Sequence, residues 1–296
     1  MAGLGIVFGL AGALLSAVSF VFSRRFIVRG HGQAVSLLVL GHVMMGLVAV
    51  TFATASWNDA MSDVGHWAPK AALAAATYLV GNVAFFFALG RTEASRVAPL
   101  LGLKLVAVAV LAIFVLGEDV STIQWLAVAL TVSAAFVLNR VGGSVPASTI
   151  LAIAFAVICF STSDVYIRAT IDALGPPDQL ATSLRALAVI YILCGSVAVI
   201  LLPWFGSARG RDWKAAAPYA GIWYLAMVCF YFAMATAGVV LGNIAWSTRG
   251  LFAIFLGGLL ARAGFVHLEQ KVNRGVLVRR ALAAAMMVGA IVLYGA

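Results

Sequence analysis

The stretch GLGIVFGLAGALLSAVSFVFS, residues 3–23, contains no charged residue. A helix that crosses a bilayer needs about 20 consecutive apolar residues, and this stretch supplies them. It has no cationic leader, and no small-residue cleavage signal precedes the next apolar segment, so we expect it to be retained as a span. The stretch predicts an integral membrane protein built from helices.

The composition of the whole chain supports this interpretation. Of 296 residues, 64% are hydrophobic and 10% are charged, and the mean hydropathy is +1.09. Soluble domains are about 45–50% apolar with roughly a quarter of their residues charged, so a water-soluble globular domain is excluded. Disorder is excluded because it requires low hydrophobicity. The membrane setting also argues against nucleic-acid binding as the use of the net charge of +9. Cys159, Cys194 and Cys229 are spaced singly and predict packing roles.

Apolar runs continue along the chain at the length of a membrane helix. They do not alternate between apolar and polar residues, which excludes a transmembrane β-barrel. The predicted spans are residues 3–23, 34–56, 68–90, 95–116, 121–139, 147–168, 179–204, 214–236, 238–261 and 276–295. The sequence therefore predicts an all-α integral membrane protein with ten transmembrane helices.

An internal repeat relates the two halves at an offset of 145 residues. AFFFALGRTEA (84–94) aligns with CFYFAMATAGV (229–239), and SAVSFVFSR (16–24) aligns with STSDVYIRA (161–169). Lys104 falls on Arg249 at the same offset. We expect two five-helix repeats, residues 1–140 and 147–296, and an odd number of spans in each makes the repeats inverted. Inverted repeats are typical of secondary transporters, although channels also contain them.

Loop charge predicts the orientation, because Lys and Arg are retained on the cytoplasmic side. Every second connection is basic. These connections hold fourteen cations: Arg24, Arg25, Arg29, Arg91, Arg96, Arg140, Arg209, Arg211, Lys214, Arg262, Lys271, Arg274, Arg279 and Arg280. The opposite face has two, Lys70 and Arg168. The count predicts a multi-pass protein of the cell (inner) membrane whose termini are both extracytoplasmic.

Ionisable groups inside spans are the candidate functional residues, because a charge in the bilayer centre costs about 2.5–3.5 kcal/mol on insertion scales. Lys104 and Arg249 lie near the centres of their spans, without an obvious acidic partner at that depth. They predict a site for the negative group of an anionic or zwitterionic substrate; the alternative is that they snorkel or bond to backbone carbonyls and nearby amides. Asp164 and Arg185 lie at similar depths, so we expect a structural or gating ion pair.

Polar and aromatic residues at compatible depth complete the predicted binding site: Tyr78, Asn82, Asn243, Trp246 and His42. His42 would permit proton coupling, and its alternative role is that of a hydrogen-bonded packing residue. Motifs for phosphate binding, hydrolysis and metal ligation are absent from the sequence. We therefore expect no enzyme activity, no cofactor and no metal, and any uphill transport would use an ion gradient or exchange.

Several motifs resemble the repeat of EamA-type transporters. The segment 88–139 contains a proline, Pro99, a glycine–glutamate turn, Gly117–Glu118, and a closing span rich in small residues. In PPDQLATSLRALAVIYIL (176–193), Arg185 follows two prolines, as in that repeat. The chain resembles a ten-helix member of the drug/metabolite transporter superfamily over nearly its whole length.

This resemblance implies a carrier of small metabolites whose cavity is lined by the inner helices of each half. The chain departs from the pattern at RAGFVHLEQKVNRGVLVRR (262–280), a long basic loop in place of a short Gly–Glu turn. It also departs in orientation, since many relatives are thought to keep both termini in the cytoplasm.

The leading hypothesis is a secondary transporter of amino acids, organic acids or phosphorylated metabolites that works by alternating access. One alternative is an exporter of drugs or hydrophobic cations, which three intramembrane cations against one acid disfavour. An alternative of another class is a membrane scaffold or a lipid-handling protein. The expected partners are the bilayer and a small-molecule substrate, and the chain is expected to be a monomer or homodimer.

Overall fold

The computed structural model describes residues 2–31, 33–89, 103–138, 147–175, 178–207, 209–262 and 274–295. These residues form helices and no strand. The elements are α1 (Ala2–Val28), α2 (Ala34–Ala55), α3 (Asp59–Ser62), α4 (Val64–Leu89), α6 (Lys104–Leu111), η1 (Ala112–Leu116), α7 (Thr122–Leu138), α8 (Ala147–Ala173), α9 (Gln179–Phe205), α10 (Gly210–Ala237), α11 (Val239–Ser247), α12 (Arg249–Arg262) and α13 (Arg274–Gly295).

The helices confirm the predicted all-α membrane fold. Six of them are long and apolar enough to cross a membrane: Ala2–Val28, Ala34–Ala55, Ala147–Ala173, Gln179–Phe205, Gly210–Ala237 and Val239–Gly257. Shorter apolar helices cover Lys104–Leu116, Thr122–Val137 and Ala281–Gly295. Each of the ten predicted spans has a helical counterpart, although Pro99 and the join near residues 140–146 lie outside the described residues.

Two helix boundaries depend on glycine in the left-handed region. Gly117 follows η1 with φ +68°, and the amide of Glu118 then bonds back to the carbonyl of Ala112. Gly238 separates α10 from α11 with φ +83°. L side chains rarely adopt such angles, so glycine is required at both turns. Within the predicted span 238–261, a single residue, Thr248, separates α11 from α12.

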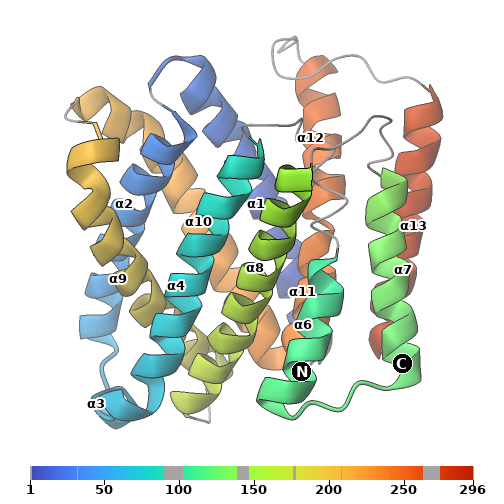
Figure 1. Cartoon of the computed structure of the whole chain (residues 1–296), viewed down its shortest axis with the longest axis horizontal. Helices are drawn as coiled ribbons and strands as arrows, with labels where there is room; N and C mark the ends of the chain where they lie inside the picture. The colour runs from blue at the N-terminus through green and yellow to red at the C-terminus, as the bar shows by residue number, and fades with distance from the viewer. Residues whose placement is uncertain are drawn as a thin grey trace.

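The helices run alternately between two faces of the molecule, and both termini lie at the same face (Figure 1). The most extensive packing pairs α1 with α10, α4 with α8, α2 with α9, and α7 with α13. At the 145-residue offset, α1 corresponds to α8, and α4 corresponds to α10. The pair α1 with α10 is therefore equivalent to the pair α8 with α4 when the two halves are exchanged. In Figure 1, α1 and α8 run in opposite directions. Two intertwined inverted repeats would give this pattern; the division at 140 and 147 stays a prediction.

Glycines allow the helices to approach closely. A Cβ atom at Gly9 of α1 would lie 2.6 Å from the Cβ atom of Ala245 in α11. Where α2 crosses α9, a Cβ atom at Gly46 would lie 2.9 Å from the Cα atom of Gly195. Small residues at such crossings bring the backbones together, which stabilises helix association in lipid, where there is little hydrophobic drive.

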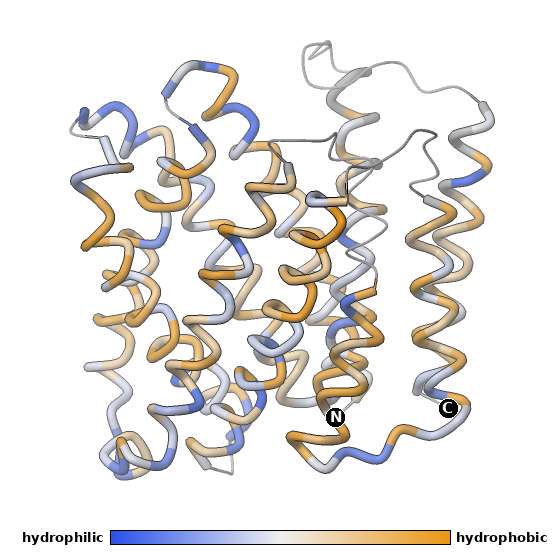
Figure 2. The backbone as a smooth tube through the Cα atoms, in the orientation of Figure 1, coloured by the Kyte–Doolittle hydropathy of each residue, from blue (hydrophilic) through white to orange (hydrophobic). Residues whose placement is uncertain are grey.

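Polar residues gather at the two ends of the helix bundle, and apolar residues occupy most of its middle (Figure 2). The described basic turns, residues 24–31 and 209–214, lie at the face opposite the termini. We call the face that carries these turns the basic face, and the face that carries both termini the terminal face.

Candidate functional site

A cavity of about 880 Å³ lies inside the helix bundle. Its lining includes Phe20, Ser23 and Ile27 at the end of α1, and Gln33, Ala34 and Val35 at the start of α2. These two segments flank the basic turn at residues 24–31, so the cavity extends from the interior toward the basic face. Volumes of about 300–1,000 Å³ are typical of pockets for small molecules.

Three charged side chains line the cavity among the described residues: Lys104, Asp164 and Arg249. The Nζ atom of Lys104 lies 2.6 Å from Oδ2 of Asp164, and the side chains are 18% and 8% exposed. The hydroxyl of Ser161 donates a hydrogen bond of 3.2 Å to the carbonyl oxygen of Lys104 and so fastens α6 to α8. The expectation that Lys104 lacks an acidic partner is therefore wrong.

The predicted ion pair between Asp164 and Arg185 is also wrong. The Nε atom of Arg185 donates to the carbonyl oxygen of Ser56, at 3.2 Å, and thereby caps the C-terminal end of α2. Helix α8 packs against α6 while α9 packs against α2, and each of the two side chains meets its own neighbour. Sequence position gives the depth of a residue in a helix but not the neighbour toward which it points.

Arg249 has a different environment. Its guanidinium lies over the ring of Trp246, with 5.6 Å from Cζ to the ring centroid. It forms no ion pair with a described residue. A cation over an aromatic face gains about 0.5–2 kcal/mol, which stabilises Arg249 without neutralising its charge.

Lys104 and Arg249 share one structural property. Each is the first residue of a helix that begins beside the cavity, α6 and α12 respectively. The unpaired N–H groups of a helix N-terminus carry a partial positive charge, so a cation at this position is unfavourable for the helix itself. This helix-end effect applies to α6, because α12 follows α11 after Thr248 alone, whose backbone is also helical, and Val239–Gly257 is long enough to cross the membrane as one span. The side-chain charges of Lys104 and Arg249 make this part of the cavity attractive to anions.

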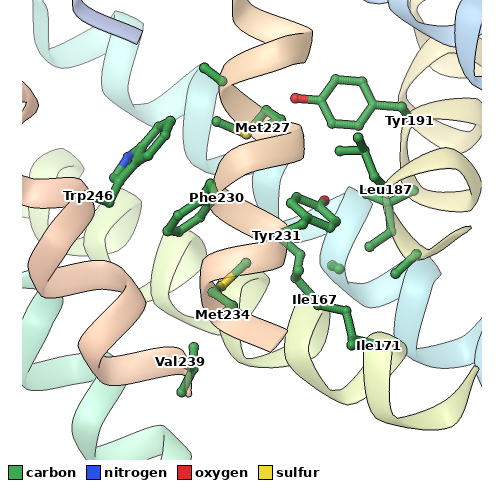
Figure 3. Close-up of a cluster of buried hydrophobic side chains, with 14 of the residues drawn as sticks. Ile167, Ile171, Leu187, Tyr191, Met227, Phe230, Tyr231, Met234, Val239 and Trp246 are labelled. Carbon is green, nitrogen blue, oxygen red and sulfur yellow. The ribbon is translucent and has the colours of Figure 1, made fainter. Parts of the chain in front are cut away.

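Aromatic side chains form much of the remaining cavity wall. In Figure 3, Trp246, Phe230 and Tyr231 extend from α11 and α10, and Tyr191 faces α10 from α9. The rings of Phe230 and Trp246 are 4.5 Å apart. The indole of Trp223 donates to the hydroxyl of Tyr191 at 3.1 Å. Trp223 was not among the predicted site residues. It lies in the middle of the predicted span 214–236, away from the membrane interface where tryptophan is common, and this position could have marked it as a site residue.

The other predicted site residues divide into two groups. Tyr78 and Asn82 line the cavity, and the Asn82 amide donates to the Tyr78 carbonyl oxygen at 2.8 Å. His42 and Asn243 are not among the lining residues. His42 Nδ1 lies 2.8 Å from the Leu38 carbonyl oxygen, and its ring stacks on Tyr191. Asn243 donates to the Val239 carbonyl oxygen at 3.0 Å, so both side chains bond their own helices behind the wall.

A polar cluster closes the opposite end of the molecule, at the terminal face. Arg168 of α8 donates hydrogen bonds to the carbonyl oxygens of Met234 (2.6 Å) and Ala235 (2.9 Å) at the C-terminal end of α10. It also pairs with Asp172 at 3.0 Å. Glu118 accepts a hydrogen bond from the amide of Val239, and burial raises the pKa of its carboxyl. Together Arg168 and Glu118 hold both sides of the break between α10 and α11.

The chain is similar to transporters in sequence, and its fold is similar to that of a solved structure. Residues 3–140 match the EamA-like transporter family. A protein from Sinorhizobium sp. described as an uncharacterized transporter in the cobO 3' region is 28% identical over 129 residues, which are 44% of this chain and 92% of that protein. A solved crystal structure of a protein aligns over 98% of this chain and 95% of its own, with a TM-score of 0.72 and 16% identity. At that identity the structural likeness shows the fold alone.

The apolar helices and the similarity to transporters define the class as a multi-pass α-helical membrane transporter. More particularly, residues 3–140, slightly under half of the chain, match the EamA-like transporter family, and this match supports the predicted resemblance to the drug/metabolite transporter superfamily.

Proposed function

We propose that this transporter carries a small organic monoanion or a zwitterion, such as an amino acid or an organic acid, by alternating access. The observation that carries the proposal is the placement of two intramembrane cations, Lys104 and Arg249, in one cavity. Lys104 also stands at the start of α6, and discontinuous helices in transporters direct their N-termini at the anionic groups of their substrates.

The charges in the cavity indicate the substrate charge. Lys104 and Arg249 contribute two positive charges and Asp164 one negative charge, so the described lining residues carry one net positive charge. A carboxylate or a phosphate monoanion would neutralise it. Because Asp164 already pairs with Lys104, Arg249 is the cation that is available for the first contact with substrate. The aromatic wall favours a substrate that also has an apolar or ring-shaped part.

Alternating access is supported by the contrast between the two ends of the cavity. The lining reaches the basic face, and the Arg168 cluster holds the helices together at the terminal face. Transport requires the reverse arrangement as well, in which the cluster opens and the other end closes. The loop charges support an inner-membrane location with the basic face in the cytoplasm, which makes this conformation open to the inside.

Export of hydrophobic cations is the second candidate function. Asp164 and the aromatic wall favour it, because aromatic faces and a carboxylate both attract organic cations. Two cations in the same cavity oppose it.

Thermal unfolding of the purified protein with a panel of ligands separates the two functions, because a ligand that binds only the folded state raises its stability. We expect carboxylates or amino acids to stabilise the protein, and Arg249→Gln to weaken that binding by about 10- to 100-fold, the loss expected when a charged hydrogen bond is removed. Arg24→Gln removes an exposed cation that does not line the cavity, and it is the matched control. Selective stabilisation by organic cations, or full anion binding in Arg249→Gln, would overturn the proposal.

A further inference from the structure

A second, smaller hollow lies at the basic face, between the last turns of α1 and the first turns of α10. It has a volume of about 160 Å³. It is lined by Phe22, Arg25 and Phe26 of α1 and by Arg29, whose amide bonds to the Arg25 carbonyl oxygen just after the helix, a spacing that places all four on one helical face. Lys214, Ala215 and Pro218 of α10 and His31 complete it. The face of α1 with Phe20, Ser23 and Ile27 lines the central cavity instead, so α1 separates the two spaces.

Three cations around this hollow have no acidic partner in the part of the chain that the structure describes. Arg25, Arg29 and Lys214 form no ion pair with any described residue. The nearby carboxylate, Asp212, is already engaged: its oxygens lie 2.8 Å from His31 Nδ1 and 2.6 Å from the donating hydroxyl of Ser207. Like charges gathered around one hollow repel each other, and a bound anion would relieve that repulsion.

We propose that this hollow, the α1–α10 pocket, binds the phosphate group of an anionic phospholipid. Arg25 and Arg29 supply guanidinium groups that suit phosphate oxygens, and Lys214 faces them from α10. The buried ring of Phe26 lies among the lining residues. The volume is several times the roughly 30 Å³ that one water molecule occupies in the liquid, which suits a phosphate group and excludes a larger part of the lipid.

The position of the pocket favours a lipid over free phosphate. The pocket lies at the end of α1 and the start of α10, where membrane helices meet the headgroup region. From this level toward the membrane interior the adjoining surface is apolar. Leu225, two turns beyond Pro218 on α10, is 51% exposed, and Val18 lies one turn before Phe22 on α1. A phosphate in the pocket would leave the acyl chains of its lipid along this apolar surface. Basic pockets between membrane helices are known to take anionic headgroups.

The experiment measures lipid binding to the purified full-length protein in detergent, by native mass spectrometry and by thermal unfolding. Phosphatidylglycerol, phosphatidylcholine and inorganic phosphate are added separately at equal ionic strength. We expect saturable binding of phosphatidylglycerol at one tight site. The variant Arg25→Gln/Arg29→Gln should weaken that binding by about 10-fold or more, since each cation near an anionic lipid surface contributes about 1 kcal/mol. Lys214→Gln should weaken it by a smaller factor.

The matched control is Arg24→Gln/Arg209→Gln, which removes two exposed cations from the same face but none from the pocket. Retention of tight binding in the control supports the proposal. An equal loss in the control would overturn it, because the attraction would then be general to the basic face. Equal binding of phosphatidylcholine, or complete replacement of the lipid effect by inorganic phosphate, would overturn it too. All the substituted side chains are exposed, and unchanged unfolding without lipid verifies that each variant folds.

Discussion

Lys104 and Arg249 occupy equivalent positions in the two halves of the chain, yet they meet different neighbours. Lys104 pairs with Asp164 at 2.6 Å, whereas Arg249 lies over Trp246 and forms no ion pair with a described residue. The position equivalent to Asp164 in the first half, at the same offset, is Ser19, a buried serine whose hydroxyl bonds to the Ser16 carbonyl oxygen. A carboxyl in the second half thus stands where the first half has a hydroxyl, and Lys104, unlike Arg249, has an ion-pair partner among the described residues.

The two ends of the molecule show a similar difference. Arg168 holds the end of α10 at the terminal face, and the equivalent position in the first half is Ser23, which lines the cavity near the basic face. Ser23 cannot span to a neighbouring helix end as Arg168 does. At the 145-residue offset, a long cation at the terminal face thus corresponds to a short hydroxyl near the basic face.

The largest expected effect comes from breaking the buried pair. Asp164→Asn leaves Lys104 charged and without a partner among apolar walls, and removal of one member of a buried pair costs about 3–5 kcal/mol. We expect the unfolding free energy of the purified protein to fall by that amount. Lys104→Met/Asp164→Asn removes both charges and should recover most of the loss. The control, Asp172→Asn, affects a side chain that is 51% exposed, and it should cost less than about 1 kcal/mol. Equal stability of Asp164→Asn and wild type would show that the pair is not buried as described.

The second effect concerns the closed end. Arg168→Ala removes two hydrogen bonds from a charged group to the end of α10. Hydrogen bonds of this kind each contribute about 1.5–3 kcal/mol to stability. We expect the amides around Gly238 to exchange hydrogen roughly 10- to 100-fold faster, because this end opens more often. Lys70→Ala is the control, since Lys70 bonds within its own helix at the same end. Faster exchange in both variants would assign the effect to general loss of charge.

The fold could be predicted from the sequence because span length and apolar composition are local properties of the chain. Each helix from α1 to α13 that matches a predicted span does so within a few residues where the structure describes it. The candidate site was predicted less completely. Lys104, Arg249, Tyr78, Asn82 and Trp246 do line one cavity, since a charge or polar group in a span has few other places to lie. The partner of Asp164 depended on rotation about the helix axis and on packing between distant helices, which residue spacing does not specify.

A third prediction tests whether the missing carboxyl in α1 is what keeps Arg249 available. Ser19→Asp places an acid in the half whose α1 packs against α12, the helix that begins at Arg249. If the halves are equivalent, this acid competes for Arg249 as Asp164 does for Lys104. We expect the affinity for an anionic ligand to fall about 10-fold, or about 1.4 kcal/mol. Ser19→Asn has a similar volume without the charge, and it should retain most of the affinity. An equal loss in both variants would indicate a packing effect.

The smallest expected effect is the pH dependence of the Glu118 contact. Burial raises the pKa of the Glu118 carboxyl above its ordinary value of 4.5, so the folded chain holds this proton more tightly than the unfolded chain. The resulting stabilisation is fully present below the ordinary value and is lost as the pH rises through the raised value. Glu118→Gln cannot titrate and should remove this component from the curve of unfolding free energy against pH. Asp119→Asn, at the exposed neighbouring residue, is the control and should leave the component in place. If the wild-type curve instead rises with pH across this window and Glu118→Gln lacks that rise, the contacts with Arg168 and the Val239 amide outweigh burial, and the ionised Glu118 is the form that holds α11 to the end of α10.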